Sequence, residues 1–209
     1  MRRDNMQLLL VATRNPGKLI EIQSLLEGIN ITLTTPDIYG IPLNVEENGS
    51  TYEENASLKA RLFARSSGLV TLADDSGLEV DILEGKPGIH SARFSPLPNA
   101  TDADRRAYLL GLLRHHPRPW TAHFHCTVAI ATQDDTLYYA QGNCPGEVIP
   151  EERGSNGFGY DPIFLLPEVG LTMAELSMEE KNRLSHRARA VKAALPILWA
   201  IFRNQNDRS

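Results

Sequence analysis

Two aspartates stand side by side in the apolar run LADDSGLEVD, residues 72–81. Because side chains alternate along a strand, Asp74 and Asp75 would point to opposite faces of a sheet, and at least one would be desolvated in a central strand. An ionised carboxylate is rarely buried without a partner. The pair therefore predicts either a polar site or, more simply, a strand end followed by a turn at Ser76 and Gly77.

The segment ATRNPGK, residues 12–18, joins a predicted strand to a predicted helix and is a candidate phosphate-binding loop. The first backbone N–H groups of a helix have no partner within that helix, and they attract anions. The letters do not match a Walker sequence, because Ala12 stands in place of its first glycine and Leu19 in place of its Ser or Thr. A plain turn built on the NPG tripeptide explains the same residues.

The stretch RGSNGFGYDPIF, residues 153–164, is rich in glycine and aromatic residues. Glycine lets the backbone approach a ligand closely, and Phe158 and Tyr160 could stack on a flat base. Asp161 is the nearby hydrogen-bond acceptor. A glycine-rich hairpin packed on the core is the simpler explanation of this stretch taken alone.

Positive charge gathers near the C-terminus, in SMEEKNRLSHRARAVKAAL at residues 177–195. The capping-box pattern S-x-x-E starts a helix at Ser177, and Ser185 offers a second start. Arg183 and Arg187 are four apart, which predicts a shared helix face. A solvated basic helix explains this run, but in an acidic protein the cluster also suits a polyphosphate or an oxo-substituted base.

Carboxylates at two points of the chain could hold a divalent cation, namely the pair Glu46 and Glu47 and the pair at 74–75. Mg²⁺ prefers oxygen ligands, and one or two protein carboxylates suffice because water and substrate phosphate complete its octahedron. His123 and His125 share one face of a predicted strand. We expect them to contact solvent or a helix, because no third metal ligand has matching spacing.

The periodicity of apolar residues predicts the elements that carry these segments. Strands are expected over 7–13, ITLTT, 69–74, 78–83 and 120–130, and a hairpin turn at 133–135 leads into TLYYAQG. Helices are expected over 18–26, 50–68 and 101–116, the second starting with capping boxes that pair Ser50 with Glu53 and Thr51 with Glu54. Interleaved helices and strands followed by a meander predict an α/β fold, a mixed sheet flanked by helices.

The composition indicates a single globular domain over residues 1–209, with 42% hydrophobic and 22% charged residues. The apolar runs are too short to span a bilayer, so we expect no membrane partner. A net charge of −5 offers no broad basic surface for a nucleic-acid polymer. Cys126 and Cys144 lack the spacing of a zinc site or a disulfide framework, which favours a reducing cytoplasm.

Six segments in this order resemble the inosine/xanthosine triphosphate pyrophosphatase family. They are ATRNPGK, EENGSTYEENASLKA, LADDSGLEVD, KPGIHSARF, GSNGFGYDPIF and EEKNRLSHRARA. Each segment alone is a modest signal, but their order is highly specific, and the resemblance runs from about residue 8 to residue 195. It implies hydrolysis of ITP, dITP or XTP to the nucleoside monophosphate and pyrophosphate, with Mg²⁺, in a homodimer. It also implies an elongated, two-lobed structure around a long mixed sheet, with the substrate in a cleft between the lobes.

The resemblance also implies roles for single residues. Asp75 would be the general base, and Glu47 with Asp75 would hold the metal. From the aspartate pair itself we expect Asp74 to have a supporting role, hydrogen-bonded at the strand end. The nucleotide would be bound by residues of four segments: Thr13, Arg14, Asn15, Pro16, Gly17 and Lys18; Ser76; Phe158, Gly159, Tyr160 and Asp161; and Lys181, His186 and Arg187.

A nucleotide-binding or RNA-binding regulatory module on the same scaffold is the alternative function. It would keep the pocket but would not need Asp75 and Glu47, so their presence favours an enzyme. A glycosidase could also use paired carboxylates, but it would not need Lys18 at a helix start. A serine hydrolase is disfavoured because Ser76 lacks the G-x-S-x-G elbow.

Overall fold

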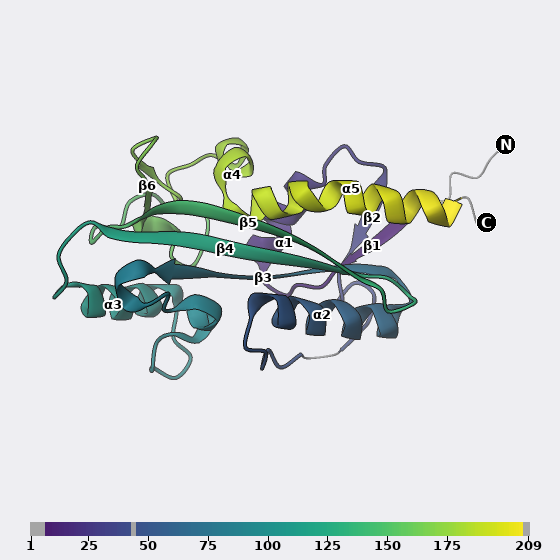
Figure 1. Cartoon of the computed structure of the whole chain (residues 1–209), viewed down its shortest axis with the longest axis horizontal. Coiled ribbons are helices and arrows are strands. Elements are labelled where there is room, and N and C mark those ends of the chain that lie inside the picture. The colour runs from purple at the N-terminus through teal and green to yellow at the C-terminus, as the bar shows by residue number, and fades with distance from the viewer. Residues whose placement is uncertain (1–6, 43–44, 207–209) are drawn as a thin grey trace. The chain divides into compact units, whose positions relative to one another are not determined.

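In the computed structural model, which describes residues 7–42 and 45–206, seven strands form one mixed sheet (Figure 1). Its order is β2-β1-β3-β4-β5-β6-β7. The strands are β1 (Gln7–Val11), β2 (Ile31–Thr34), β3 (Val70–Val80), β4 (Trp120–Ala131), β5 (Leu137–Val148), β6 (Phe164–Leu166) and β7 (Leu171–Thr172). β1 pairs in parallel with β2 and β3, whereas β6 pairs antiparallel with β5 and β7. The predicted α/β class with a mixed sheet is confirmed.

Helices form in the segments in which the sequence predicts them. The α-helices are α1 (Pro16–Leu25), α2 (Tyr52–Ser67), α3 (Asp102–Leu113), α4 (Met178–Leu184) and α5 (His186–Asn206), and the short 3₁₀ helices are η1 (Asp81–Leu83), η2 (Gly88–Arg93) and η3 (Asp161–Ile163). α4 begins with the predicted capping box of Ser177 and Glu180. Within the described ranges, no helix combines the length and the apolar character needed to cross a bilayer.

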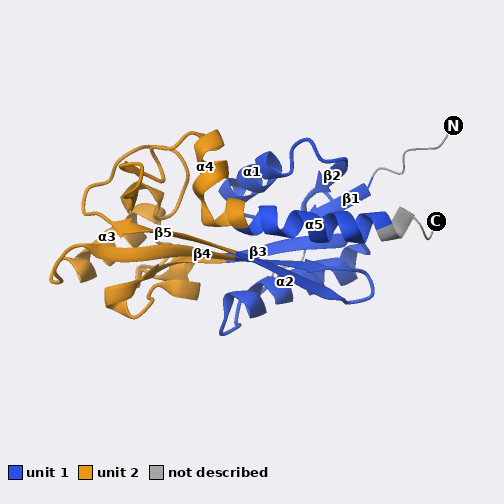
Figure 2. Ribbon diagram, turned by 45° about the horizontal axis from the view of Figure 1, so that its top comes forward, with its two compact units in different colours: residues 1–75, 127–141, 190–209 blue, residues 76–126, 142–189 orange. Residues whose placement is uncertain are grey.

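The chain divides into two compact units (Figure 2). Unit 1 comprises residues 1–75, 127–141 and 190–209, and unit 2 comprises residues 76–126 and 142–189. The boundaries fall inside β3, β4, β5 and α5, so these elements contribute residues to both units. The expectation of a single domain over residues 1–209 and of a substrate cleft stays a prediction.

Unit 1 packs α2 against its strands through small side chains. Ala56, Ala60 and Ala64 of α2 are at most 1% exposed, and they belong to one buried cluster with Leu10 of β1 and Ala73 of β3. Small residues let the helix approach the sheet closely, so polar side chains on the same helix face also reach the strands. α5 covers the opposite face of these strands (Figures 1 and 2).

Unit 2 has its own core, in which α3 contributes Leu109 and Leu113. β4 adds alternate residues to this core, including Trp120 and Phe124, as its sequence pattern predicts. Beyond Cys126 every residue of β4 is buried, so the alternation ends halfway along the strand. A strand covered on both faces has no polar side to display.

The predicted turn between Asp74 and Gly77 is wrong, because β3 continues without a break from Val70 to Val80. Both aspartates are buried inside this strand. The turn prediction assumed that adjacent carboxylates must reach water, whereas protein groups on neighbouring elements hold them instead. The segment predicted as the end of a second strand, residues 81–83, forms η1.

The start of α2 also differs in detail from the predicted capping. Thr51 is the N-cap, and its side chain accepts a hydrogen bond from the backbone N–H of Glu54, as predicted. Ser50 does not pair with Glu53. Its backbone N–H and its hydroxyl both donate to Glu54 Oε2, over 2.6 and 2.7 Å, so one carboxylate oxygen binds both polar groups of Ser50.

Candidate active site

The buried Asp74 of β3 forms an ion pair with the first turn of α1. Lys18 Nζ lies 2.9 Å from Asp74 Oδ2, and the two side chains are 16% and 1% exposed. Asp74 therefore lies in the middle of a strand and is held by a cation, which corrects the expectation of a hydrogen bond at a strand end. This ion pair also directs the Lys18 ammonium toward the paired aspartates.

Asp75 is held from the opposite direction by α2. Asn55 is fully buried, and its side-chain amide donates a hydrogen bond to Asp75 Oδ2 over 3.0 Å. Burial raises the pKa of Asp75 above its ordinary value, and the positive charges of Lys59 and Lys18 offset this only in part. A carboxylate that takes up a proton more readily than usual is suited to act as a general base.

A third carboxylate reaches the same region through Lys59. Lys59 Nζ lies 2.7 Å from Glu47 Oε1, with side chains 11% and 32% exposed. Burial by itself lowers the pKa of Lys59, but the negative charges of Asp74, Asp75 and Glu47 outweigh it and leave that pKa raised. We name these three carboxylates together with Lys18 and Lys59 the carboxylate–lysine cluster. All five residues belong to unit 1.

The loop before α1 has the geometry of a helix start. Asn15 is the N-cap, and its side chain accepts a hydrogen bond from the backbone N–H of Lys18 over 3.1 Å, while Pro16 and Gly17 form the first helical positions. Thr13 Oγ1 accepts from the backbone N–H of Asn15 over 3.2 Å. Arg14 is exposed, and its Nε lies 3.6 Å from Asp37 Oδ1.

A second group of predicted residues gathers in unit 2 around Lys181. Lys181 Nζ lies 2.7 Å from Asp161 Oδ2, and both side chains are 5% exposed. The same carboxylate oxygen accepts a hydrogen bond from the backbone N–H of Phe158 over 2.9 Å. The ring of Phe158 has the Lys181 ammonium 5.3 Å and the Arg187 guanidinium 5.5 Å from its centroid. A half-buried aromatic ring beside two cations is suited to bind an electron-rich, oxygen-substituted base.

The helix start at Ser185 separates the two arginines that the sequence places on one face. Ser185 has an extended backbone between α4 and α5, so Arg183 and Arg187 lie on different helices, and the predicted shared face is wrong. Arg183 is exposed and pairs with Glu179. Arg187 is 1% exposed, and its guanidinium donates to Ser76 Oγ over 2.9 Å.

The remaining predicted residues of unit 2 belong to its core or to its backbone framework. His186 is buried and stacks on Phe124, with ring centroids 4.6 Å apart. Tyr160 is 4% exposed, and its hydroxyl donates to the carbonyl of Ser91 over 2.9 Å. Its ring therefore packs in the core, whereas the expected stacking surface for a base remains available only at Phe158.

The carboxylate–lysine cluster has a donor set that fits a magnesium ion. Its three carboxylates outnumber its two ammonium groups, and the charge of Glu47 further raises the pKa of Asp75, so the two carboxylates repel each other. A divalent cation would relieve that repulsion. Among the described residues no group of three or more His, Cys, Asp or Glu side chains could hold a metal, so phosphate and water would have to complete the ligand shell.

The two histidines of β4 have other partners in the structure. His123 Nε2 lies 3.0 Å from Glu79 Oε2, and His125 Nδ1 lies 2.6 Å from Asn143 Oδ1. Both partners lie on neighbouring strands of unit 2, Glu79 on β3 and Asn143 on β5, whereas we expected contacts with solvent or a helix.

Sequence reasoning missed Asn55 and Lys59. They are four apart on α2, among the alanines of its buried face. The signal was available, because a polar side chain at core-facing helical spacing needs a buried partner. That partner could not be identified without the fold.

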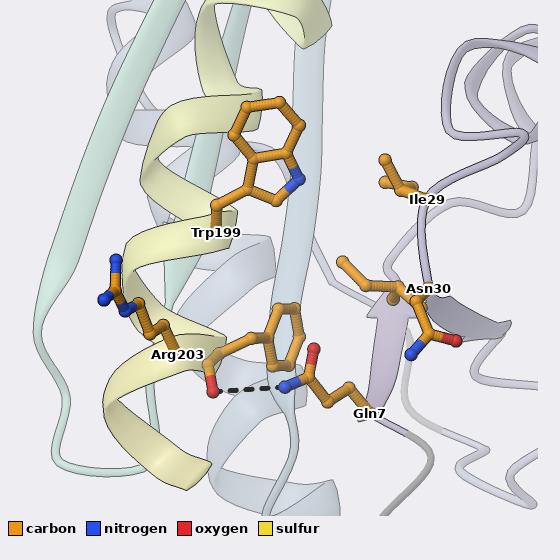
Figure 3. Close-up of a pocket in the computed structure, with 7 residues that line it drawn as sticks. Gln7, Ile29, Asn30, Trp199 and Arg203 are labelled. Carbon is orange, nitrogen blue, oxygen red and sulfur yellow. Dashed lines mark hydrogen bonds between the residues drawn. The ribbon is translucent and has the colours of Figure 1, made fainter. Parts of the chain in front are cut away.

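One described cavity lies away from these groups, in unit 1 (Figure 3). It is lined by Gln7, Ile29, Asn30, Ile31, Trp199, Phe202 and Arg203. Gln7 closes one side of it with a hydrogen bond from its side-chain amide to the carbonyl of Phe202, over 3.1 Å. Its lining is mainly apolar and contains no carboxylate, so it differs in character from the carboxylate–lysine cluster.

The fold and the charged groups define an α/β protein whose mixed sheet carries buried carboxylates paired with lysines. The model of the Ham1 family matches residues 9–197, and the chain belongs to this family.

Named relatives and solved structures agree with that membership. The chain is 48% identical over 187 residues to a dITP/XTP pyrophosphatase of Geobacter sulfurreducens, covering 89% of this chain and 94% of the relative. It is 43% identical to a dITP/XTP pyrophosphatase of Desulforamulus reducens, covering 94% and 98%. The structure of a HAM1 protein from Coxiella burnetii superposes with a TM-score of 0.84 at 40% identity, covering 93% of this chain and 100% of that one. The family resemblance predicted from six motifs is confirmed.

Proposed function

We propose that this protein hydrolyses non-standard purine nucleoside triphosphates, namely ITP, dITP and XTP, to the nucleoside monophosphate and pyrophosphate. The observation that carries the proposal is Asp75, a buried carboxylate with a raised pKa that lies close to the charges of Lys18 and Lys59. A base and two cations are the groups that phosphoryl transfer to water requires. The names of the curated relatives support the same reaction.

Asp75 would accept the proton of the attacking water. The water oxygen forms a bond to the α-phosphorus, the α–β anhydride bond breaks, and pyrophosphate leaves. Lys18 and Lys59 provide fixed positive charge for the triphosphate oxygens, which costs less reorganisation than water would. The loop from Thr13 to Gly17 would contribute backbone N–H groups at the start of α1.

Glu47 and Asp75 would hold Mg²⁺, and the ion would supply charge neutralisation at the phosphate oxygens. Their mutual repulsion in the structure supports this assignment. The role of this chain's own groups is then to keep two carboxylates close together. Lys59 restrains Glu47 through their ion pair, and Asn55 restrains Asp75 through its amide.

The residues gathered around Phe158 would bind the base. Phe158 offers its ring for stacking. The charged groups of Lys181 and Arg187 lie near this ring, and His186 directly precedes Arg187 in α5. Hypoxanthine and xanthine carry a carbonyl at the purine 6-position, whereas adenine carries an amino group. A buried donor that faces an amino group would lose its partner, and such a mismatch costs about 1–3 kcal/mol or more. Donor groups here would therefore reject adenine. Ser76 and Asp161 would act with them, Ser76 through Arg187 and Asp161 through Lys181.

We also propose that the protein is a cytoplasmic homodimer, with a nucleotide as its partner and with no nucleic-acid polymer or membrane. The two free, buried cysteines support the cytoplasm, the net charge of −5 argues against a nucleic-acid polymer, and the homodimer rests on the family resemblance. No observation favours the regulatory-module alternative, since such a module would not need a buried base of raised pKa.

A substrate panel with identification of the products tests the proposal. The purified protein with Mg²⁺ should release pyrophosphate from ITP and XTP much faster than from ATP or GTP. Asp75→Asn should lose this activity, whereas Glu79→Gln on the same strand should retain it, because Glu79 contacts His123 instead. Orthophosphate as the sole product, or equal rates on ATP and ITP, would contradict the proposal.

A further inference from the structure

Two side chains of α3 hold the glycine-rich loop, which we define as residues 154–161. The backbone N–H of Gly159 donates to Asp102 Oδ2 over 2.8 Å, and the carbonyl of Gly159 accepts from Arg106 Nη1 over 2.9 Å. Asp102 and Arg106 are four apart, so they lie on the same face of α3. One helix therefore satisfies both polar backbone groups of a single loop residue.

Both side chains are themselves restrained. Arg106 Nε and Nη2 donate to the two carboxylate oxygens of Glu152, over 2.8 and 2.9 Å, which is a bidentate geometry. Asp102 also accepts from the guanidinium of Arg105. Burial raises the pKa of Asp102, but the hydrogen bonds from Arg105 and from Gly159 outweigh it and leave that pKa lowered. Asp102 is thus ionised at neutral pH, and charge-assisted hydrogen bonds are stronger than neutral ones.

The contact matters because Gly159 directly follows Phe158. Gly159 has φ of +61°, in the left-handed region, and a Cβ there would meet nothing within 4 Å. No described side chain packs against this side of Gly159, and its two hydrogen bonds to α3 hold its peptide groups. The peptide before Phe158 is tied separately, through its N–H to Asp161. The backbone on both sides of the Phe158 ring is therefore fixed, on one side by Asp161 and on the other by α3.

We propose that Asp102 and Arg106 are positioning residues for the base. By fixing Gly159 they orient the ring of Phe158 toward the flat base of the nucleotide, without contact to the phosphates. This inference rests on the proposed function. Restraint of a stacking side chain before the substrate arrives strengthens binding, because less freedom is lost when the substrate binds.

Kinetics of three variants test the proposal, together with inorganic tripolyphosphate as a competitor that lacks a base. Asp102→Ala should raise KM for ITP about tenfold, the loss expected for one hydrogen bond to a charged group, with kcat within about twofold. The inhibition constant of tripolyphosphate should not change. Asp102→Asn keeps an acceptor oxygen for Gly159 and should restore most of the KM. Asp104→Ala is the matched control, since it removes the capping box of α3 but no contact to the loop.

Amide hydrogen exchange at Gly159 tests the contact without any activity. Asp102→Ala should accelerate exchange at this amide, whereas Asp102→Asn and Asp104→Ala should leave it near the wild-type rate. Arg106→Ala provides an independent second variant with the same expected rise in KM. If wild-type protein fails to hydrolyse ITP, the proposed function fails, and the exchange rates still decide whether α3 holds the loop.

Three outcomes would overturn the proposal. The first is a wild-type KM for ITP in Asp102→Ala. The second is an equal loss of affinity for ITP and for tripolyphosphate, because the effect would then not concern the base. The third is a rise in KM for ITP in Asp104→Ala as large as that in Asp102→Ala, because Asp102 would then act only by stabilising helix α3.

Discussion

The side-chain amide of Asn55 spans two parts of unit 1, because it donates to Asp75 Oδ2 over 3.0 Å while its oxygen accepts from the backbone N–H of Gly49 over 2.8 Å. Gly49 lies two residues from Glu47. A single buried amide thus links the strand that carries one proposed metal carboxylate to the loop that carries the other. Its two hydrogen bonds use both functions of the amide, which Asp or Leu could not reproduce.

Asn55→Ala is expected to lower both activity and stability. The buried carboxylate of Asp75 and the half-buried backbone N–H of Gly49 would each lose one hydrogen bond, and such losses cost about 1–3 kcal/mol each. Asp75 would also lose its orientation, and a displaced catalytic group costs about 10²-fold in kcat. Denaturant unfolding and ITP turnover measure the two effects. Ser57→Ala on the same helix is the control, because its hydroxyl bonds to Glu53 and Tyr139 and not to the carboxylate–lysine cluster. A wild-type kcat in Asn55→Ala would contradict this role.

Asp75→Asn is expected to lower kcat by about 10²- to 10⁴-fold. It is also expected to stabilise the metal-free protein at neutral pH. Since the pKa of Asp75 is raised above 3.8 in the folded protein, the native state holds this proton more tightly than the unfolded chain does. Ionisation therefore costs stability as the pH rises through the folded pKa. The amide removes that cost.

Thermal unfolding in EDTA as a function of pH measures this effect. The advantage of Asp75→Asn should be full above the pKa of Asp75 and should shrink as the pH falls toward 3.8. A constant difference at every pH, or a variant that is less stable at neutral pH, would show that ionised Asp75 is not destabilising.

Lys59→Met is expected to shift the pH dependence of kcat/KM. The positive charge of Lys59 lowers the pKa of Asp75, so its removal should raise that pKa further. The general base must be deprotonated, and the acid limb of the profile should therefore move to higher pH. The exposed Lys192→Met is the control for the loss of one positive charge in unit 1. An acid limb that stays in place would mean that Asp75 is not the group that titrates.

Gly157→Ala is expected to destabilise the protein far more than Gly159→Ala. Both glycines have positive φ, of +76° and +61°, and a side chain there costs about 1–2 kcal/mol. At Gly157 a Cβ would also lie 2.0 Å from Asp161 Oδ2 and 2.8 Å from Lys181 Nζ. Disruption of a buried ion pair costs about 3–5 kcal/mol. Urea unfolding of the two variants makes the comparison, and equal losses would show that the Lys181–Asp161 pair adjusts freely.

Local chemistry in the chain accounts for much of what could be predicted. The capping residues Thr51 and Ser177 start helices where their spacing to a glutamate predicts, and the alternation of apolar residues predicts β4. These features depend on neighbours a few residues away, so the letters alone reveal them. The six motifs revealed the family for the same reason, since each is a short, continuous segment.

Predictions failed where the outcome depended on distant partners. The aspartate pair was expected to break the strand, but Lys18 and Asn55 hold it inside β3. Tyr160 was expected to stack on a base, and it packs in the core with its hydroxyl on Ser91. In each case a residue 20 or more positions away decides whether a polar group can be buried. The spacing of apolar residues along the chain does not identify that residue.

The order of elements, the helix starts and the chemistry-bearing motifs were determined by the amino-acid sequence itself, because covalent spacing controls them. Only the tertiary structure decided which charged and polar residues pair with one another. Three contacts join residues from 20 to 57 positions apart in the chain. They are the ion pair of Lys181 with Asp161, the hydrogen bond of Asn55 with Asp75 and the hydrogen bond of Gly159 with Asp102. Burial then sets the pKa of Asp75, because desolvation depends on everything packed around the carboxyl group and not on its neighbours in the chain.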